Sequence, residues 1–113
     1  MVKRKKTEFG EFLVNEIKKA DLSQEQFYKA VGIAKPYFYD MLNAAPPPPD
    51  IQEKMVDVLN NKTGIDLIRT RMLFDLAARG RNEIPADIRK NLLDNSAEWN
   101  KIRELLEAVL TVK

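Results

Sequence analysis

Apolar residues recur every three or four positions along most of this chain, which is the spacing of one face of an α-helix. The first such stretch covers residues 8–20, and Thr7 stands immediately before it, where a helix N-cap belongs. The strict alternation of apolar and polar residues that is typical of a strand does not occur in the sequence. The pattern therefore predicts an all-α protein.

A short polar break separates this first helix from two closely spaced helices. Ser23 followed three residues later by Gln26 is typical of a capping box, and it predicts that a helix begins here and covers residues 24–31. Gly32 follows the last helical position, where a left-handed backbone costs glycine little. A third helix is predicted over residues 35–43, with a proline in its first turn.

Four further helices are expected in the rest of the chain. Four consecutive prolines exclude a helix and predict a stiff connector, after which Asp50 is expected to cap the fourth helix. A fifth helix over residues 65–79 is expected to end at Gly80. Two more helices follow, one beginning at Pro85 and one capped by Ser96.

Composition excludes several kinds of functional site. The chain has no Cys and no His, which excludes disulfides, thiolate metal sites, the commonest zinc ligand and the commonest general base. Lys, Tyr and carboxylate residues form no pair with a catalytic spacing, so we expect no enzyme, no metal and no cofactor. No apolar run approaches the ~20 residues of a membrane span, and the N-terminus lacks the apolar segment of a signal peptide. We expect a cytoplasmic protein without a membrane partner.

The charge of the chain is nearly balanced, with 19 Lys and Arg against 17 Asp and Glu. Residues 1–60 contain nine basic and nine acidic residues, and four of the basic ones are Lys3, Arg4, Lys5 and Lys6. A segment that binds DNA needs positive charge against the phosphates. In this chain the N-terminal tail supplies much of it.

Two stretches, residues 22–33 (LSQEQFYKAVGI) and residues 37–43 (YFYDMLN), resemble the helix-turn-helix of the lambda-repressor/Cro (XRE) family. The amphipathic helix before them and the proline-rich loop after them match the same order, so the resemblance covers residues 8–60. It implies a lambda-repressor-like fold, with a DNA-binding domain of about four helices and a C-terminal extension of about three helices.

The resemblance divides the chain into three parts. Residues 1–6 form a basic N-terminal tail, residues 7–60 form the DNA-binding domain, and residues 61–113 form the helical extension. Two positions depart from the family pattern: Ala34 replaces a Ser or Thr cap, and Asp40 stands where basic or neutral residues are common.

The resemblance also implies a set of contacts with double-stranded DNA. The helix at residues 35–43 enters the major groove, with Lys35 at the first base-contacting position. Gln24 resembles a phosphate contact, and Asn43 resembles a contact with the DNA backbone. The expected DNA-contacting residues are Ser23, Gln24, Lys35, Pro36, Tyr37, Tyr39, Asp40 and Asn43, together with Lys3, Arg4, Lys5 and Lys6 as a basic arm.

The second half of the chain carries more apolar surface than a four-helix unit needs for its own core. Apolar residues at steps of three or four near the C-terminus are typical of a helix–helix seam. We expect a homodimer whose interface contains Met72, Leu73, Trp99, Ile102, Leu106 and Val109. The alternative is that the last helices fold back and complete the core of a monomer.

These observations predict a sequence-specific transcriptional regulator that binds operator DNA as a homodimer. A repressor of bacterial, phage or mobile-element type fits the size of the chain best. Two alternatives stay open at this point. One is a DNA-binding antitoxin whose C-terminal helices bind a partner toxin, and the other is a helical protein-interaction module without DNA binding.

Overall fold

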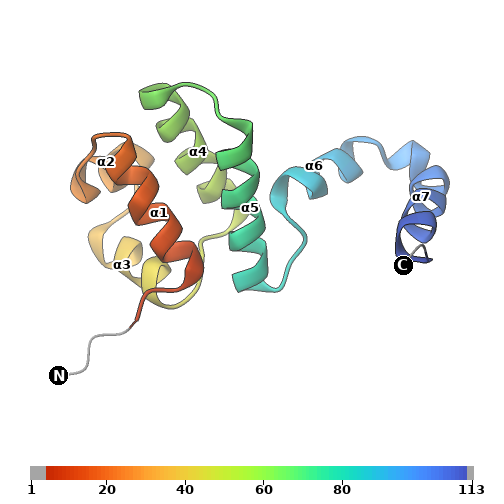
Figure 1. Cartoon of the computed structure of the whole chain (residues 1–113), viewed down its shortest axis with the longest axis horizontal. Helices are drawn as coiled ribbons and strands as arrows, with labels where there is room; N and C mark the ends of the chain where they lie inside the picture. The colour runs from red at the N-terminus through yellow and green to blue at the C-terminus, as the bar shows by residue number, and fades with distance from the viewer. Residues whose placement is uncertain (1–4, 112–113) are drawn as a thin grey trace.

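The computed structural model describes residues 5–111, and within that range it contains helices and no strand (Figure 1). The prediction of an all-α protein is confirmed. Lys3 and Arg4 of the predicted basic tail lie outside the described residues. The α-helices are α1 (Glu8–Lys19), α2 (Gln24–Val31), α3 (Lys35–Asn43), α4 (Pro49–Thr63), α5 (Leu67–Arg81), α6 (Ala86–Asp94) and α7 (Trp99–Thr111), with a 3-10 helix η1 (Ser96–Glu98) before the last.

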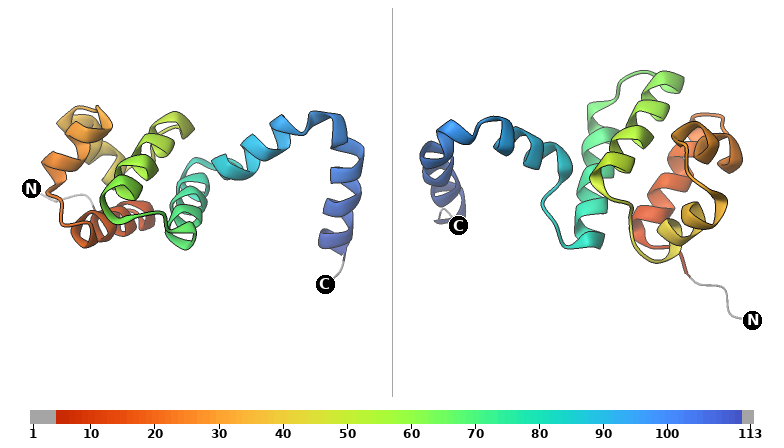
Figure 2. Two further views of the ribbon diagram at one scale, coloured as in Figure 1. Left: turned by 90° about the horizontal axis from the view of Figure 1, so that it is seen from above. Right: turned by 180° about the vertical axis from the view of Figure 1, so that it is seen from behind.

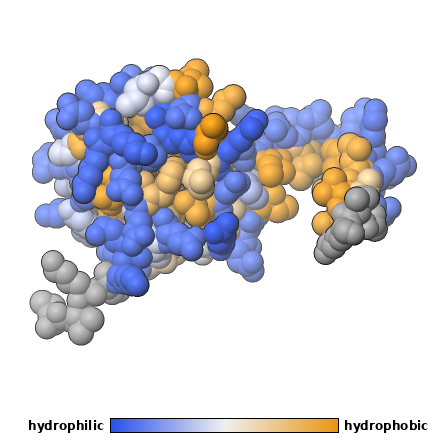
Figure 3. All heavy atoms as spheres, in the orientation of Figure 1, coloured by the Kyte–Doolittle hydropathy of each residue, from blue (hydrophilic) through white to orange (hydrophobic). Residues whose placement is uncertain are grey.

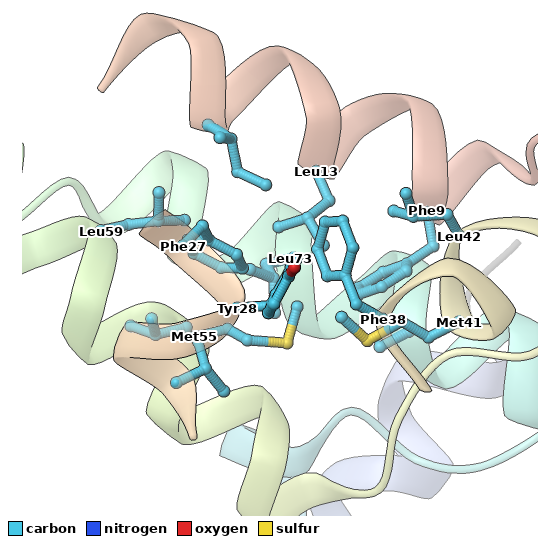
Figure 4. Packing of buried hydrophobic residues seen from close by; sticks show 14 of the residues in the cluster. Phe9, Leu13, Phe27, Tyr28, Phe38, Met41, Leu42, Met55, Leu59 and Leu73 are labelled. Carbon is cyan, nitrogen blue, oxygen red and sulfur yellow. The ribbon is translucent and has the colours of Figure 1, made fainter. Parts of the chain in front are cut away.

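Helices α1 to α5 pack around a common apolar core. α1 lies against α3 and α5, and α4 lies against α2 and α5. The largest side chains at the centre are Phe9, Phe27 and Phe38, each 1% exposed or less (Figure 4). Burial of such aromatic side chains supplies a large part of the hydrophobic free energy of a small domain.

Local sequence signals set several of the helix ends as predicted. The Thr7 side chain accepts a hydrogen bond from the backbone N–H of Gly10 at 3.0 Å. Ser23 and Gln26 form the predicted capping box at the start of α2, and Gly32 after α2 has a left-handed backbone with φ 90°.

The prediction that Asp50 caps α4 is wrong. α4 begins at Pro49, preceded by Pro48 as an N-cap without a side-chain hydrogen bond, and Asp50 lies within the first turn. A proline suits the first helical position because its fixed φ is helical and its missing N–H has no partner there. The preceding Pro46 and Pro47 are buried, so this segment packs onto the core.

The prediction that Gly80 ends the fifth helix is also wrong. α5 continues to Arg81 and ends at Asn82, which has a left-handed backbone with φ 56°. A Cβ atom at Gly80 would lie 2.7 Å from Cγ of Pro46, so glycine permits α5 to approach the proline segment closely. The core residue Leu73 lies on the same helix, and the core thus extends past the predicted boundary at residue 60.

The C-terminal arm, defined here as α6, η1 and α7, extends away from the α1–α5 core (Figures 1 and 2). α6 packs against α5, and the chain then turns through η1 into α7. Ser96 was predicted to cap the last helix, but it begins η1, and α7 starts at Trp99. The indole N–H of Trp99 donates to the carbonyl oxygen of Leu92 at 3.2 Å, which fixes this turn.

Candidate nucleic-acid interface

The turn between α2 and α3 is closed by backbone hydrogen bonds. The N–H of Gly32 donates to the carbonyl oxygens of Tyr28 and Lys29 at 3.0 and 3.2 Å, and the N–H of Ile33 donates to Tyr28 at 3.0 Å. Only glycine adopts the required left-handed backbone without a Cβ penalty. The chain therefore reverses within two residues, and α3 begins at a fixed angle to α2.

Aromatic packing ties α3 to α2. The Phe38 ring lies 6.2 Å from the Phe27 ring and 5.4 Å from the Tyr28 ring, measured between centroids. Phe38, together with Met41 and Leu42, forms the buried face of α3 (Figure 4). These contacts leave the opposite face of α3 without a role in the core.

The outward face of α3 carries five of the predicted contact residues: Lys35, Pro36, Tyr37, Tyr39 and Asp40 are all exposed. Tyr37 is 41% exposed and Tyr39 is 38% exposed. Tyrosine rings are large enough to be mostly buried in a core, but these two remain on the surface. The Tyr39 ring packs edge-on against Phe38 at 5.4 Å, which fixes its orientation. The core beneath α3 therefore holds the Tyr39 ring in place on this face.

Two other predicted contacts near this face, Ser23 and Asn43, form hydrogen bonds within the chain. Oγ of Ser23 accepts from the Gln26 N–H at 3.0 Å, so its main role in this structure is the cap of α2. The side-chain amide of Asn43 donates to the carbonyl oxygen of Tyr39 at 2.9 Å. Gln24 is half-buried in the first turn of α2. Contact of these residues with DNA stays a prediction.

Glu25 on α2 brings negative charge close to this face, which the sequence analysis did not anticipate. Its carboxylate accepts from Nζ of Lys29 at 2.9 Å. This hydrogen bond lowers the pKa of Glu25, and the positive charge of Lys35 on α3 lowers it further. The spacing of Glu25 and Lys29 is visible in the sequence, but the approach of Lys35 depends on the angle between α2 and α3.

The described part of the basic tail starts beside the C-terminal end of α3. The backbone N–H and the hydroxyl of Thr7 both donate to the carbonyl oxygen of Leu42, at 3.0 and 3.3 Å. Lys5 and Lys6 immediately precede Thr7 and are exposed. These two lysines therefore lie next to the C-terminal end of α3.

The predicted dimer interface is corrected at one position. Leu73 is 0% exposed and belongs to the core, so it is not available to a partner. Its neighbour Met72 is 45% exposed, because it lies on the outer side of α5. The other predicted interface residues lie on α7, where Trp99, Leu106 and Val109 are exposed and Ile102 is half-buried.

Several exposed apolar residues lie outside the set predicted for the dimer interface. They lie at the start of α5 and along the arm, where apolar residues gather on the surface (Figure 3). Those at least 48% exposed include Ile65, Leu67, Ile68, Ile84, Ile88, Leu93, Leu105 and Leu110. Periodicity showed that these segments are apolar, but only the packing shows which residues stay uncovered.

Other kinds of site find no support among residues 5–111. No group of three or more acidic, His or Cys side chains in this range is arranged to hold a metal ion. The described helices also include none with the length and apolarity needed to cross a bilayer. Comparison with protein-family models, with characterised proteins and with solved structures finds no match to this chain.

Proposed function

We propose that this chain is a helix-turn-helix DNA-binding regulator of repressor type, which places α3 in the major groove of its operator and binds as a homodimer. The observation that carries the proposal is the outward face of α3. Lys35, Tyr37 and Tyr39 are exposed there on a helix whose other face is buried and whose angle to α2 is fixed by the Gly32 turn. A major groove about 12 Å wide admits such a helix.

The side chains on this face have chemistry suited to base edges and phosphates. The Lys35 ammonium can donate to O6 or N7 of guanine, and the tyrosine rings can contact thymine methyl groups while their hydroxyls donate to phosphates. Asp40 is suited to accept from the N4 amine of cytosine. Together these residues give the face a capacity for sequence discrimination.

Contacts around α3 add affinity without adding discrimination. The first turn of α2 offers backbone N–H groups and the positive end of a helix dipole to a phosphate. Lys5 and Lys6 are exposed next to the end of α3, where they can neutralise the DNA backbone. Because few basic residues surround the face, we expect weak binding to non-specific DNA.

Repression fits the architecture of the described residues. α1 to α5 share a common core, and the arm beyond them is short. A protein that blocks a promoter by occupying it needs a DNA-binding surface and a dimer contact, whereas an activator also needs a surface for the transcription machinery. The arm is the part of the chain that we assign to the dimer contact.

Fluorescence anisotropy with labelled duplexes tests this function. One duplex carries the DNA upstream of the chain's own coding sequence, and the other is a shuffled duplex of equal composition. We expect binding that prefers the first duplex and weakens as salt increases. Lys35→Ala should reduce the preference by roughly 5- to 100-fold, the value of one good base contact.

Lys90→Ala is the matched control, because Lys90 is an exposed lysine on α6, away from α3. It removes the same charge and should leave the preference unchanged. Absence of binding to both duplexes at low salt would contradict the proposal. Equal effects of the two substitutions would contradict the assignment of α3 as the base-contacting helix.

A further inference from the structure

The C-terminal arm exposes an apolar surface that the rest of the described chain does not cover. Within residues 5–111, α7 makes no extensive contact with α1 to α5, and its main contact is with η1. The exposed apolar residues of the arm and of the segment that leads into it from α5 are 44–70% accessible: Ile84, Ile88, Leu93, Trp99, Leu105, Leu106, Val109 and Leu110. Figure 3 shows apolar atoms gathered on the arm.

A helix in this position needs a partner to be stable. α7 has 13 residues, and isolated helices shorter than about 12–15 residues are only marginally stable in water. Because the eight residues are each 44–70% exposed, they offer an area on the order of several hundred Å² per chain, of the same order as the ~800 Å² that each partner buries in a standard interface. The arm therefore offers enough area for a stable protein contact.

The arm also contains an open apolar groove between α6 and α7. Its volume is about 280 Å³, which accommodates inserted side chains. The groove is lined by Ile84, Leu92, Leu93, Trp99, Ile102 and Leu106, with Arg89 and Arg103 at its edge. Because the Trp99 indole N–H already donates to Leu92, the groove is formed within the single chain.

The apolar residues of α7 form a single continuous face. At 3.6 residues per turn, the six large apolar residues of α7 fall within an arc of about 140° around the helix. They are Trp99, Ile102, Leu105, Leu106, Val109 and Leu110. Trp99, Ile102, Leu106 and Val109 are spaced by three, four and three residues, which is the spacing of a two-helix seam. In an antiparallel pair, Trp99 lies opposite Val109 of the second copy, and Ile102 opposite Leu106, in one common register.

The charges beside this face favour the antiparallel arrangement. Arg103 and Glu107 lie along the same edge of the apolar face. In an antiparallel two-fold pair this edge faces itself, so two attractions between Arg103 of one copy and Glu107 of the other stand against one Arg103–Arg103 repulsion near the axis. A parallel pair would place the Arg103 edge against the edge that carries Lys101. Helix dipoles also favour the antiparallel pair.

We propose that a second copy of this chain covers the arm: the two α7 helices pack antiparallel about a two-fold axis, and each inserts apolar side chains into the α6–α7 groove of the other. The contact specifies the homodimer on which the proposed function rests. It leaves α3 open, because the arm and α3 lie on different sides of the core (Figure 1).

Sedimentation of the full chain without DNA tests the contact. We expect a dimer whose dissociation constant rises at least about 30-fold in Leu106→Glu, as for a central interface residue. The control Ala108→Glu adds the same charge on the other side of α7, where Ala108 is exposed, and should remain dimeric. Circular dichroism should show an unchanged thermal transition of the core in both variants, because α7 does not belong to the core.

The antiparallel register has a separate test. Arg103→Glu and Glu107→Arg should each weaken the dimer by roughly tenfold. Each substitution turns both contacts between residue 103 of one copy and residue 107 of the other into contacts between like charges. An equimolar mixture of the two variants should form mixed dimers with nearly the affinity of the unmodified chain. Pairing of Arg103 with Glu107 inside a single α7 helix cannot explain a restored affinity. Each variant has lost that pair, and mixing the two variants does not restore it.

Three results would overturn the inference: an unmodified chain that stays monomeric up to its highest soluble concentration, a Leu106→Glu variant that stays dimeric, or a mixture no tighter than either variant alone. The first would leave the arm to a different protein. Because these measurements use no DNA, a dimer that fails to bind DNA contradicts only the proposed function. A monomer that binds DNA through α3 contradicts only this inference and the homodimer.

Discussion

If α3 binds DNA as proposed, Glu25 limits the affinity that its outward face can reach. Its carboxylate lies 2.9 Å from Nζ of Lys29 and acts electrostatically on Lys35. Near a phosphate backbone, this negative charge both repels the DNA and neutralises a lysine that would otherwise attract it. Glu25 is therefore one acidic residue of this segment whose charge acts directly at the face proposed for DNA.

We predict that Glu25→Gln tightens DNA binding by roughly three- to tenfold at low salt, and that the gain decreases as salt increases. The measurement is anisotropy with the upstream duplex at two salt concentrations. Glu98→Gln is the matched control, because Glu98 is an exposed glutamate of η1 in the arm. Binding that weakens in Glu25→Gln, or that changes equally in both variants, would contradict this assignment.

The gain from Glu25→Gln should also be constant with pH near neutrality. The lowered pKa of Glu25 means that its ion pair is present above the ordinary pKa and is lost as pH falls through the lowered value. The pKa of Lys29 is raised, so the pair is lost on the alkaline side only as pH rises through that raised value. Between the lowered pKa of Glu25 and the raised pKa of Lys29 the ion pair is intact. Glu25→Gln should therefore tighten DNA binding equally at pH 6 and pH 8, two values that we choose well inside this range.

At the scale of elements, α5 determines where the core ends. Leu73 is fully buried in the core that α5 shares with α1 to α4, whereas Met72, one position away, is 45% exposed. We predict that Leu73→Ala lowers the free energy of unfolding by about 2–5 kcal/mol, and that Met72→Ala changes it by less than about 0.5 kcal/mol. Urea denaturation measures both, and equal effects would show that α5 does not belong to the core.

The sequence predicted those features of the fold that depend on local interactions. The Thr7 cap, the Ser23–Gln26 capping box and the Gly32 turn each involve residues within a few positions, and each is confirmed. Helix boundaries that depend on distant contacts were predicted wrongly. Gly80 stays inside α5 because the helix packs against Pro46, which lies far away in the sequence.

In the candidate site, too, features set by local sequence could be predicted, whereas features set by contacts between distant segments could not. The outward face of α3 followed from its periodicity, because Phe38 occupies the inward side. The periodicity of α5 did not distinguish Leu73 from Met72, since α5 is apolar around much of its circumference. The electrostatic effect of Lys35 on Glu25 requires the angle between two helices, which no local pattern encodes.

At the scale of the whole molecule, the described chain is elongated, with extents of 49, 34 and 23 Å. Its radius of gyration is 16.1 Å, against about 13 Å for a compact domain of this length. The arm accounts for the difference, since it extends from α5 on a different side of the core from α3 (Figures 1 and 2). The surface assigned to DNA and the surface assigned to a second copy are therefore separate.

An NMR titration of the ¹⁵N-labelled chain with the upstream duplex would locate the DNA-binding surface residue by residue. If α3 enters the major groove, the largest amide shift changes fall in the first turn of α2, along α3 and at Lys5 and Lys6, while α7 remains unchanged. Shift changes confined to the arm, or none at low salt, would contradict the assignment of α3 as the DNA-binding helix.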